Sequence, residues 1–267
     1  MITSPRNPKV KHLRLLMEKS RLRQEEGLFV IEGVRELHVA LTCGFTMHTL
    51  FLCPHIFTDT GKADHFKKHA PLTQELDEDV YRKTAYRGTT EGVLAIMHAK
   101  HLTPEQVRLP ENPLVLVLEA VEKPGNLGAV LRTADACGIN AVVVCDPRTD
   151  LYNPNTVRAS LGSLFSVPVL ACSSQEAYDW LVSHKMQIVA ATSRAATPYH
   201  TCLYHTPTAF VLGSEEKGLG VFWKEKAHCR VKIPMKGIID SLNVSVSAAV
   251  LCFEAVRQRN ALKNDAL

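Results

Sequence analysis

Three segments of the chain place polar residues directly after apolar, β-rich runs, and these residues are the ones that could do chemistry. The segments are NLGAVLRTADACG at 126–138, VLGSEEKGL at 211–219 and IPMKGIIDSLNVSVSAA at 233–249. In open α/β sheets, ligands bind beyond the carboxyl ends of the strands, where loops of this kind meet. The three segments therefore predict one binding crevice that is assembled from distant parts of the chain.

The first segment supplies an amide and a guanidinium. Asn126 lies where a helix is expected to begin, and Asn is common at that capping position. Arg132 follows six residues later in an otherwise apolar helix, where burial of its charge requires a partner or an anionic ligand. We therefore expect Arg132 to be functional. Gly125 and Gly128 give only part of the G-x-G-x-x-G pattern, which disfavours a nicotinamide-dependent dehydrogenase.

The other two segments offer glycines, acids and a polar helix start. Gly213 and Gly218 bracket Glu215, and glycines at a strand end let backbone N–H groups approach a ligand closely. The triplet at 241–243, Ser-Leu-Asn, opens the last helix with side-chain and backbone donors. Taken alone, the second segment could also be a charged surface turn, and the third a capped helix that packs on the sheet.

The rest of the sequence predicts the elements that position these loops. From about residue 112 onward, apolar strand-like runs alternate with helical segments, which is typical of a mainly parallel sheet covered by helices on both faces. Before a polar, proline-bearing stretch at 99–113, shorter strands and helices predict a small α/β domain. We expect residues 1–104 to form the first domain and residues 105–267 the second.

Composition indicates a globular protein with a basic N-terminal arm. The 267 residues are 46% hydrophobic and 22% charged, and no apolar run reaches the ~18 residues of a membrane span. Residues 1–24 hold seven Lys or Arg against one acid, which indicates a polyanion-binding surface or a solvated helix face. Eight scattered cysteines without a secretion signal predict reduced thiols in the cytoplasm. We identify no pair of histidines at ligand spacing that is associated with acids or cysteines able to complete a metal site, so we expect no metal.

In order and spacing, the three segments resemble the motifs of the SpoU/TrmH family of RNA ribose 2′-O-methyltransferases, a branch of the knotted SPOUT methyltransferases. The similarity runs from about 112 to 260, and the segments SPRNPKVKHLRLL and FVIEGVRELHVAL resemble the ribosomal-protein-like RNA-binding domain of that family. The sequence departs from the family at Lys123, where an acid is frequent, and at Ser247, where alanine is usual.

The resemblance implies a sheet whose C-terminal part is threaded into a trefoil knot, an exception to the rule that chains are unknotted. It also implies a homodimer, and transfer of a methyl group from S-adenosylmethionine to a ribose 2′-hydroxyl of structured rRNA or tRNA. The alternative is a non-catalytic RNA-binding protein that retains the knot fold and does not bind the methyl donor.

The same resemblance, together with the basic N-terminal arm, assigns site residues in three groups. The expected catalytic centre comprises Asn126, Arg132, Glu215 and Asn243. The methyl donor is expected at Thr192, Leu212, Gly213, Ile233, Met235, Ser241, Leu242 and Asn243. The expected RNA contacts are Arg6, Lys9, Lys11, Arg14 and Arg158. Because a guanidinium stays protonated, we expect Arg132 to clamp a phosphate beside the target ribose rather than to act as a base.

Overall fold

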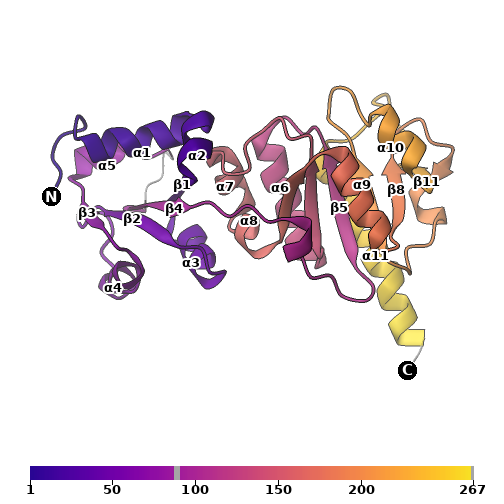
Figure 1. Cartoon of the computed structure of the whole chain (residues 1–267), viewed down its shortest axis with the longest axis horizontal. Helices are drawn as coiled ribbons and strands as arrows, with labels where there is room; N and C mark the ends of the chain where they lie inside the picture. The colour runs from indigo at the N-terminus through magenta and orange to yellow at the C-terminus, as the bar shows by residue number, and fades with distance from the viewer. Residues whose placement is uncertain (87–90, 266–267) are drawn as a thin grey trace. The chain divides into compact units, whose positions relative to one another are not determined.

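The structure, a computed structural model, describes residues 1–86 and 91–265, which divide into two compact units (Figure 1). The first unit contains residues 1–100 together with 150–166, and the second contains the remainder. The sequence predicts an uninterrupted second domain that starts at 105. In the structure the segment 150–166 lies inside that range in sequence but packs in the first unit.

The first unit is built on a four-stranded mixed sheet with the order β1-β4-β2-β3. Strand β4 is antiparallel to both β1 and β2, and β3 is parallel to β2. The strands are β1 (Leu28–Glu32), β2 (Met47–Leu52), β3 (Thr73–Glu75) and β4 (Val93–His98). This small α/β domain agrees with the fold class that the sequence predicts.

Helices cover both faces of this sheet, with α1, α2 and α5 on one side and α3 and α4 on the other (Figure 1). Their bounds are α1 (Pro8–Glu18), α2 (Ser20–Glu26), α3 (Val34–Thr42), α4 (Thr60–His69) and α5 (Glu78–Thr84). Helix α1 begins where the Asn7 side chain accepts a hydrogen bond from the Lys9 backbone, and it buries Val10, Leu13 and Leu16. The expected basic residues of α1 therefore remain on its solvent side.

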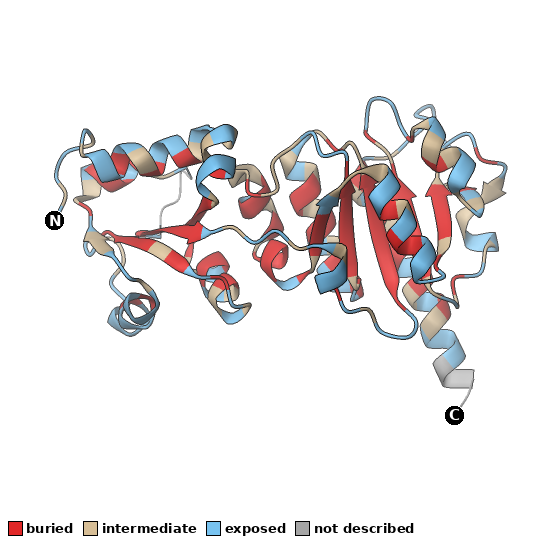
Figure 2. Ribbon diagram, in the orientation of Figure 1, coloured by how far each residue is buried: buried red, intermediate tan, exposed pale blue. Residues whose placement is uncertain are grey.

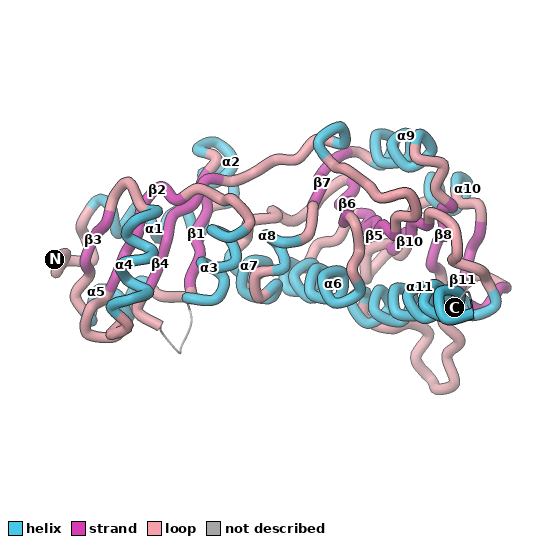
Figure 3. Tube along the Cα trace, turned by 90° about the horizontal axis from the view of Figure 1, so that it is seen from below, coloured by secondary structure: helices cyan, strands magenta, loops and turns pink. Residues whose placement is uncertain are grey.

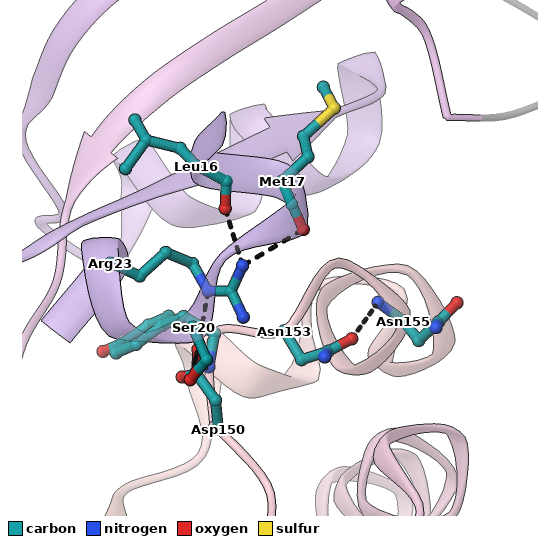
Figure 4. Close-up of polar contacts among 8 residues, drawn as sticks. Leu16, Met17, Ser20, Arg23, Asp150, Asn153 and Asn155 are labelled. Atoms are coloured by element: carbon teal, nitrogen blue, oxygen red, sulfur yellow. Dashed lines mark hydrogen bonds and ion pairs between the residues drawn. The ribbon is translucent and has the colours of Figure 1, made fainter. Parts of the chain in front are cut away.

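The segment 150–166 carries α7 (Pro154–Ser160) and α8 (Ser163–Ser166) and is fixed to the first unit by an ion pair and a ring stack. The Arg23 guanidinium donates from Nε to Asp150 Oδ2 at 2.6 Å and from Nη1 to the Leu16 carbonyl at 2.6 Å (Figure 4). The Tyr152 ring stacks on Phe29 with centroids 4.3 Å apart. These contacts explain why the segment belongs to the first unit.

The second unit is a seven-stranded parallel sheet with the order β7-β6-β5-β10-β8-β11-β9. The strands are β5 (Leu114–Glu119), β6 (Ala141–Cys145), β7 (Val169–Cys172), β8 (Gln187–Ala191), β9 (Thr197–Pro198), β10 (Thr208–Leu212) and β11 (Cys229–Lys232). The central strands β5, β6 and β10 are buried almost throughout (Figure 2). Burial on both faces is why their sequences are continuously apolar rather than alternating.

Helices α6 (Pro124–Cys137) and α11 (Val244–Asp265) cover one face of this sheet, and α9 (Ser174–Ser183) and α10 (Val221–Lys226) cover the other (Figure 3). The prediction of a parallel sheet with helices on both faces is confirmed, and the trefoil knot stays a prediction. Two short elements, α10 and β9, have no counterpart in the sequence-based expectation. None of the described helices has the length and apolar character needed to cross a bilayer.

Candidate active site

The three polar segments follow strands β5, β10 and β11 at the carboxyl edge of the sheet, where β5 and β10 are neighbours and β8 lies between β10 and β11. Strands β5 and β10 pair in parallel, with Leu118 opposite Leu212, so the start of α6 and the loop at 213–220 leave the sheet side by side. Strand β11 is parallel to β8, so the loop at 233–243 leaves from the same edge. The carboxyl edge of a parallel sheet is where such folds bind ligands, as the sequence predicts.

A chain of hydrogen bonds joins the three segments. The Asn126 amide donates from Nδ2 to Glu215 Oε1, and the Asn243 amide donates from Nδ2 to Asn126 Oδ1 at 3.2 Å. Asn243 Oδ1 in turn accepts from the Ser245 backbone N–H at 2.9 Å and from the Ser245 hydroxyl at 2.7 Å. The structure thus brings together three of the four residues expected to be catalytic.

Asn126 lies in the first turn of α6 rather than at its cap. The helix begins at Pro124, and Lys123 is the capping residue without a side-chain hydrogen bond to the helix. Proline is favoured at the first helical position because it needs no backbone N–H there, and the capping position lies three residues earlier than the sequence-based expectation. The Asn126 side chain is therefore available to the neighbouring loops.

Arg132 is exposed, and the expectation of a buried charge is wrong. Six residues of α-helix turn by about 600°, which places Arg132 and Asn126 on different sides of α6. The buried side of α6 carries Leu127, Val130, Leu131 and Ala134 instead. Among the described residues Arg132 has no hydrogen-bond or ion-pair partner, and the structure does not join it to the Asn126–Glu215 pair.

The loop after β10 closes on itself at its two glycines. A Cβ atom on Gly213 would lie 2.1 Å from the carbonyl carbon of Gly218, so only glycine fits. The buried Ser214 accepts from the Gly218 backbone N–H at 2.9 Å and, through its hydroxyl, from the Lys217 N–H at 3.2 Å. This tight turn exposes Glu215 at the edge of the sheet.

The residues expected to hold the methyl donor lie along the same edge. Leu212 ends β10, and Thr192 follows β8, where its backbone N–H donates to the Val231 carbonyl at 2.9 Å. Within the segment 233–243 the side chains of Ile233, Met235 and Leu242 are half-buried and those of Ser241 and Asn243 are exposed. The same segment exposes Ile238 and Ile239, with relative accessibilities of 105% and 63%, which sequence reasoning did not single out.

The expected RNA contacts all lie in the first unit. The side chains of Arg6, Lys9, Lys11, Arg14 and Arg158 are exposed. The Arg158 guanidinium lies over the ring of Tyr86, 5.9 Å from its centroid. Tyr86 was not predicted, because a lone tyrosine after a helix gives no functional signal in one sequence. Within residues 1–86 and 91–265 no group of three or more His, Cys, Asp or Glu could hold a metal ion.

Comparison with known proteins gives matches over both units. Residues 113–253 match the SpoU rRNA Methylase family, and residues 7–95 match the MRM3-like substrate binding domain. The 23S rRNA (guanosine(2553)-2′-O)-methyltransferase RlmP of Bacillus subtilis (strain 168) is 29% identical over 252 residues, which are 94% of this chain and 97% of that protein.

Two solved structures match nearly the whole chain. A protein described as an RNA 2′-O ribose methyltransferase is 39% identical with a TM-score of 0.84, over 97% of this chain and 99% of its own. The SpoU methyltransferase AviRb from Streptomyces viridochromogenes, solved in complex with AdoMet, is 26% identical with a TM-score of 0.88, over 96% and 99%. The family match over 141 residues (113–253), more than half of the 267, confirms the resemblance of the three segments, and the chain belongs to the SpoU rRNA methylase family.

Proposed function

We propose that this protein transfers the methyl group of S-adenosylmethionine to a ribose 2′-hydroxyl of ribosomal RNA. Membership of the SpoU family makes it an RNA 2′-O-methyltransferase. The hydrogen-bonded chain Glu215–Asn126–Asn243 is the observation that carries the proposal, because it ties the three family segments into one polar site. RlmP acts on 23S rRNA, which favours ribosomal over transfer RNA.

The carboxyl edge of the second unit fits S-adenosylmethionine, which supplies a methyl group on a cationic sulfonium. A nucleoside needs apolar surface, and the half-buried Ile233, Met235 and Leu242 provide it beside exposed polar groups. A cationic ligand is favoured by an acid, and Glu215 is exposed at the same edge. We assign donor binding to these residues together with Thr192, Leu212, Gly213, Ser241 and Asn243. The AdoMet complex of AviRb supports S-adenosylmethionine as the ligand of this family member.

The chain's own residues orient the ribose and stabilise charge. The Asn243 carboxamide is oriented by its two bonds from Ser245, and Asn126 is oriented between Asn243 and Glu215. One oxygen of Glu215 accepts from Asn126, and we assign the other to accept the hydrogen bond of the ribose 2′-hydroxyl. We assign Arg132 to the phosphate beside that ribose, where a permanent cation stabilises the developing alkoxide.

We further propose that the active form is a homodimer. Arg132 is exposed and lies on a different side of α6 from Asn126 of the same subunit. We therefore assign Arg132 of each subunit to the active site of the other subunit in the dimer. Helix α11 also exposes Val246 and Phe253, with relative accessibilities of 46% and 51%, which gives an apolar surface for pairing. We place the enzyme in the cytoplasm, since all eight cysteines are free.

The direct test is methyl transfer from radiolabelled S-adenosylmethionine to ribosomal RNA from cells that lack the gene, followed by mapping of 2′-O-methylated nucleotides. We expect Asn243→Ala to abolish transfer. The matched control is Asn260→Ala, an exposed asparagine on α11, the helix that Asn243 directly precedes, and it should keep full activity. A wild-type protein that binds RNA but neither binds the donor in calorimetry nor methylates would overturn the proposal in favour of a non-catalytic RNA-binding protein.

A further inference from the structure

The first unit contains a two-lobed cleft beside α1, α5 and α7, whereas the residues assigned to methyl transfer belong to the second unit. The smaller lobe is lined by residues that include Val30, Val157 and Arg158, and the larger lobe by residues that include Arg14, Lys83 and Asn153. Met17, Tyr86 and Pro154 line both lobes, so the two form one continuous depression. All of its lining residues belong to the first unit.

Tyr86 is the aromatic surface of this cleft. Its side chain is 48% exposed, although its hydroxyl donates to Asn155 Oδ1 at 3.1 Å and its backbone N–H donates to Glu32 Oε2 at 2.9 Å. The Arg158 guanidinium lies over the ring. Hydrogen bonds thus fix the hydroxyl and the backbone of Tyr86 while its ring stays accessible. A ring fixed in this way is preorganised for stacking, because little side-chain entropy is lost when a base binds.

Contacts within the first unit fix α7, which carries the residues that contact the Tyr86 ring and hydroxyl. The Arg23–Asp150 ion pair anchors the chain just before α7, and the Asn153 side chain caps the helix by accepting from the Asn155 backbone N–H at 2.9 Å (Figure 4). Asn155 and Arg158 follow within the next turn of α7. Their positions relative to Tyr86 are therefore set by the packing of the first unit.

The charge around the cleft suits a phosphate. The larger lobe is lined by the cations Arg14 and Lys83 and by one acid, Glu18. The smaller lobe is lined by one cation, Arg158, and one acid, Glu32. Glu18 lies 3.9 Å from Arg14, a distance at which an exposed pair is weak, and Glu32 already accepts from the Tyr86 backbone. Lys83 has no ion-pair partner among the described residues. An exposed cation such as Lys83 can neutralise a phosphate of a nucleic-acid backbone.

We propose that this cleft binds one unstacked nucleotide of the RNA substrate, with its base on Tyr86 and Arg158 and its phosphate beside Lys83 and Arg14. The inference rests on the proposed function, because the occupant is part of the same RNA. Unpaired bases stack on aromatic rings and guanidinium planes, whereas the bases of a duplex are already stacked on each other. The cleft therefore selects RNA that offers a single-stranded loop or bulge, and it sets substrate choice without taking part in methyl transfer.

The test measures binding of the full-length protein to a single-stranded RNA of about ten nucleotides that carries 2-aminopurine, whose fluorescence falls when it stacks. We expect Tyr86→Ala to weaken binding about tenfold or more and to abolish the quenching, and Tyr86→Phe to retain both. Lys83→Ala should weaken binding and lower its salt dependence. A duplex of the same sequence should show no effect of Tyr86→Ala.

Two control variants match these changes outside the cleft. Tyr178→Ala removes another tyrosine beside a cation, since Lys226 lies 5.0 Å from the Tyr178 ring, and Lys68→Ala removes an exposed lysine of α4. Both should bind like the wild type. Melting curves of each variant serve to check that it is folded.

The outcomes separate this inference from the proposed function. If the wild type methylates ribosomal RNA while Tyr86→Ala binds the oligonucleotide within twofold of it, the cleft proposal is overturned and the function stands. If the quenching is the same in Tyr86→Ala and Tyr86→Phe, the ring is not a platform and the cleft proposal is likewise overturned. A wild type that binds no RNA overturns both.

Discussion

Replacement of Arg23 by methionine should destabilise the first unit far more than loss of a surface ion pair. The Arg23 and Asp150 side chains are only 3% and 10% exposed, and the guanidinium donates at 2.6 Å to both Asp150 and the Leu16 carbonyl. Arg23→Met leaves the Asp150 carboxylate without a cation, and its remaining donors among the described contacts are the Ser20 hydroxyl at 3.2 Å and the Tyr152 backbone N–H at 2.9 Å. An uncompensated buried charge of this kind costs about 3–5 kcal/mol.

A double-mutant cycle tests the cause of this loss. The double variant Arg23→Met with Asp150→Leu removes both charges, and we expect it to recover most of the free energy of unfolding, because an apolar pair of similar size replaces a buried ion pair at little cost. Arg21→Met is the matched control, since Arg21 pairs with Glu25 at 2.6 Å but is 89% exposed, and it should change stability by less than about 1 kcal/mol.

The assay for this cycle is urea unfolding followed by circular dichroism and tryptophan fluorescence, with the transitions of the two units fitted separately where they do not coincide. The reasoning is refuted if Arg23→Met costs no more than Arg21→Met, or if the double variant is as unstable as the single one.

The remaining predictions concern the second unit. Gly213→Ala should abolish donor binding in calorimetry, because the added Cβ would displace the loop that carries Glu215. Gly237→Ala should bind the donor normally, because a Cβ added at that position would have none of the surrounding atoms within 4 Å. S-adenosylmethionine at about one hundred times its Kd should raise the free energy of unfolding of the wild type by about 2.7 kcal/mol, and equal stabilisation of Gly213→Ala would contradict the placement of the site. The variants Arg132→Ala and Asn243→Ala should each be inactive alone. When the two variant proteins are mixed and their subunits exchange, methyl transfer should return to about a quarter of the wild-type level, because half of the dimers then contain one intact site out of two. Activity that does not return would argue against a site shared between subunits.

The sheet of the second unit could be predicted from the sequence because the composition of individual strands identifies them as buried strands. Runs such as LVLVL at 114–118 and AVVVC at 141–145 are apolar at every position, which only strands buried on both faces require. The order of the strands could not be predicted, since the insertion of β10 between β5 and β8 leaves no trace in local composition. That insertion is what brings the loop at 213–220 beside the start of α6.

The environment of Arg132 shows where local pattern misleads. Alanines surround this arginine in LGAVLRTADACG, and they make the helix look apolar although Ala136 is exposed. Small side chains pack on either side of a helix at little cost, so they do not define its buried face. The larger residues Leu127, Val130 and Leu131 do define that face, and weighting them alone places Arg132 on the solvent side.

The segment 150–166 is the feature that no pattern in the sequence reveals. Periodicity predicts that it is helical but not which unit it packs against, and that choice depends on single contacts such as Arg23 with Asp150 and Phe29 with Tyr152. A truncation at residue 104 would therefore leave Arg23 buried without its carboxylate. It would also remove Arg158 from the ring of Tyr86. The RNA-binding cleft thus depends on a segment of chain that lies, in sequence, within the SpoU family match at 113–253.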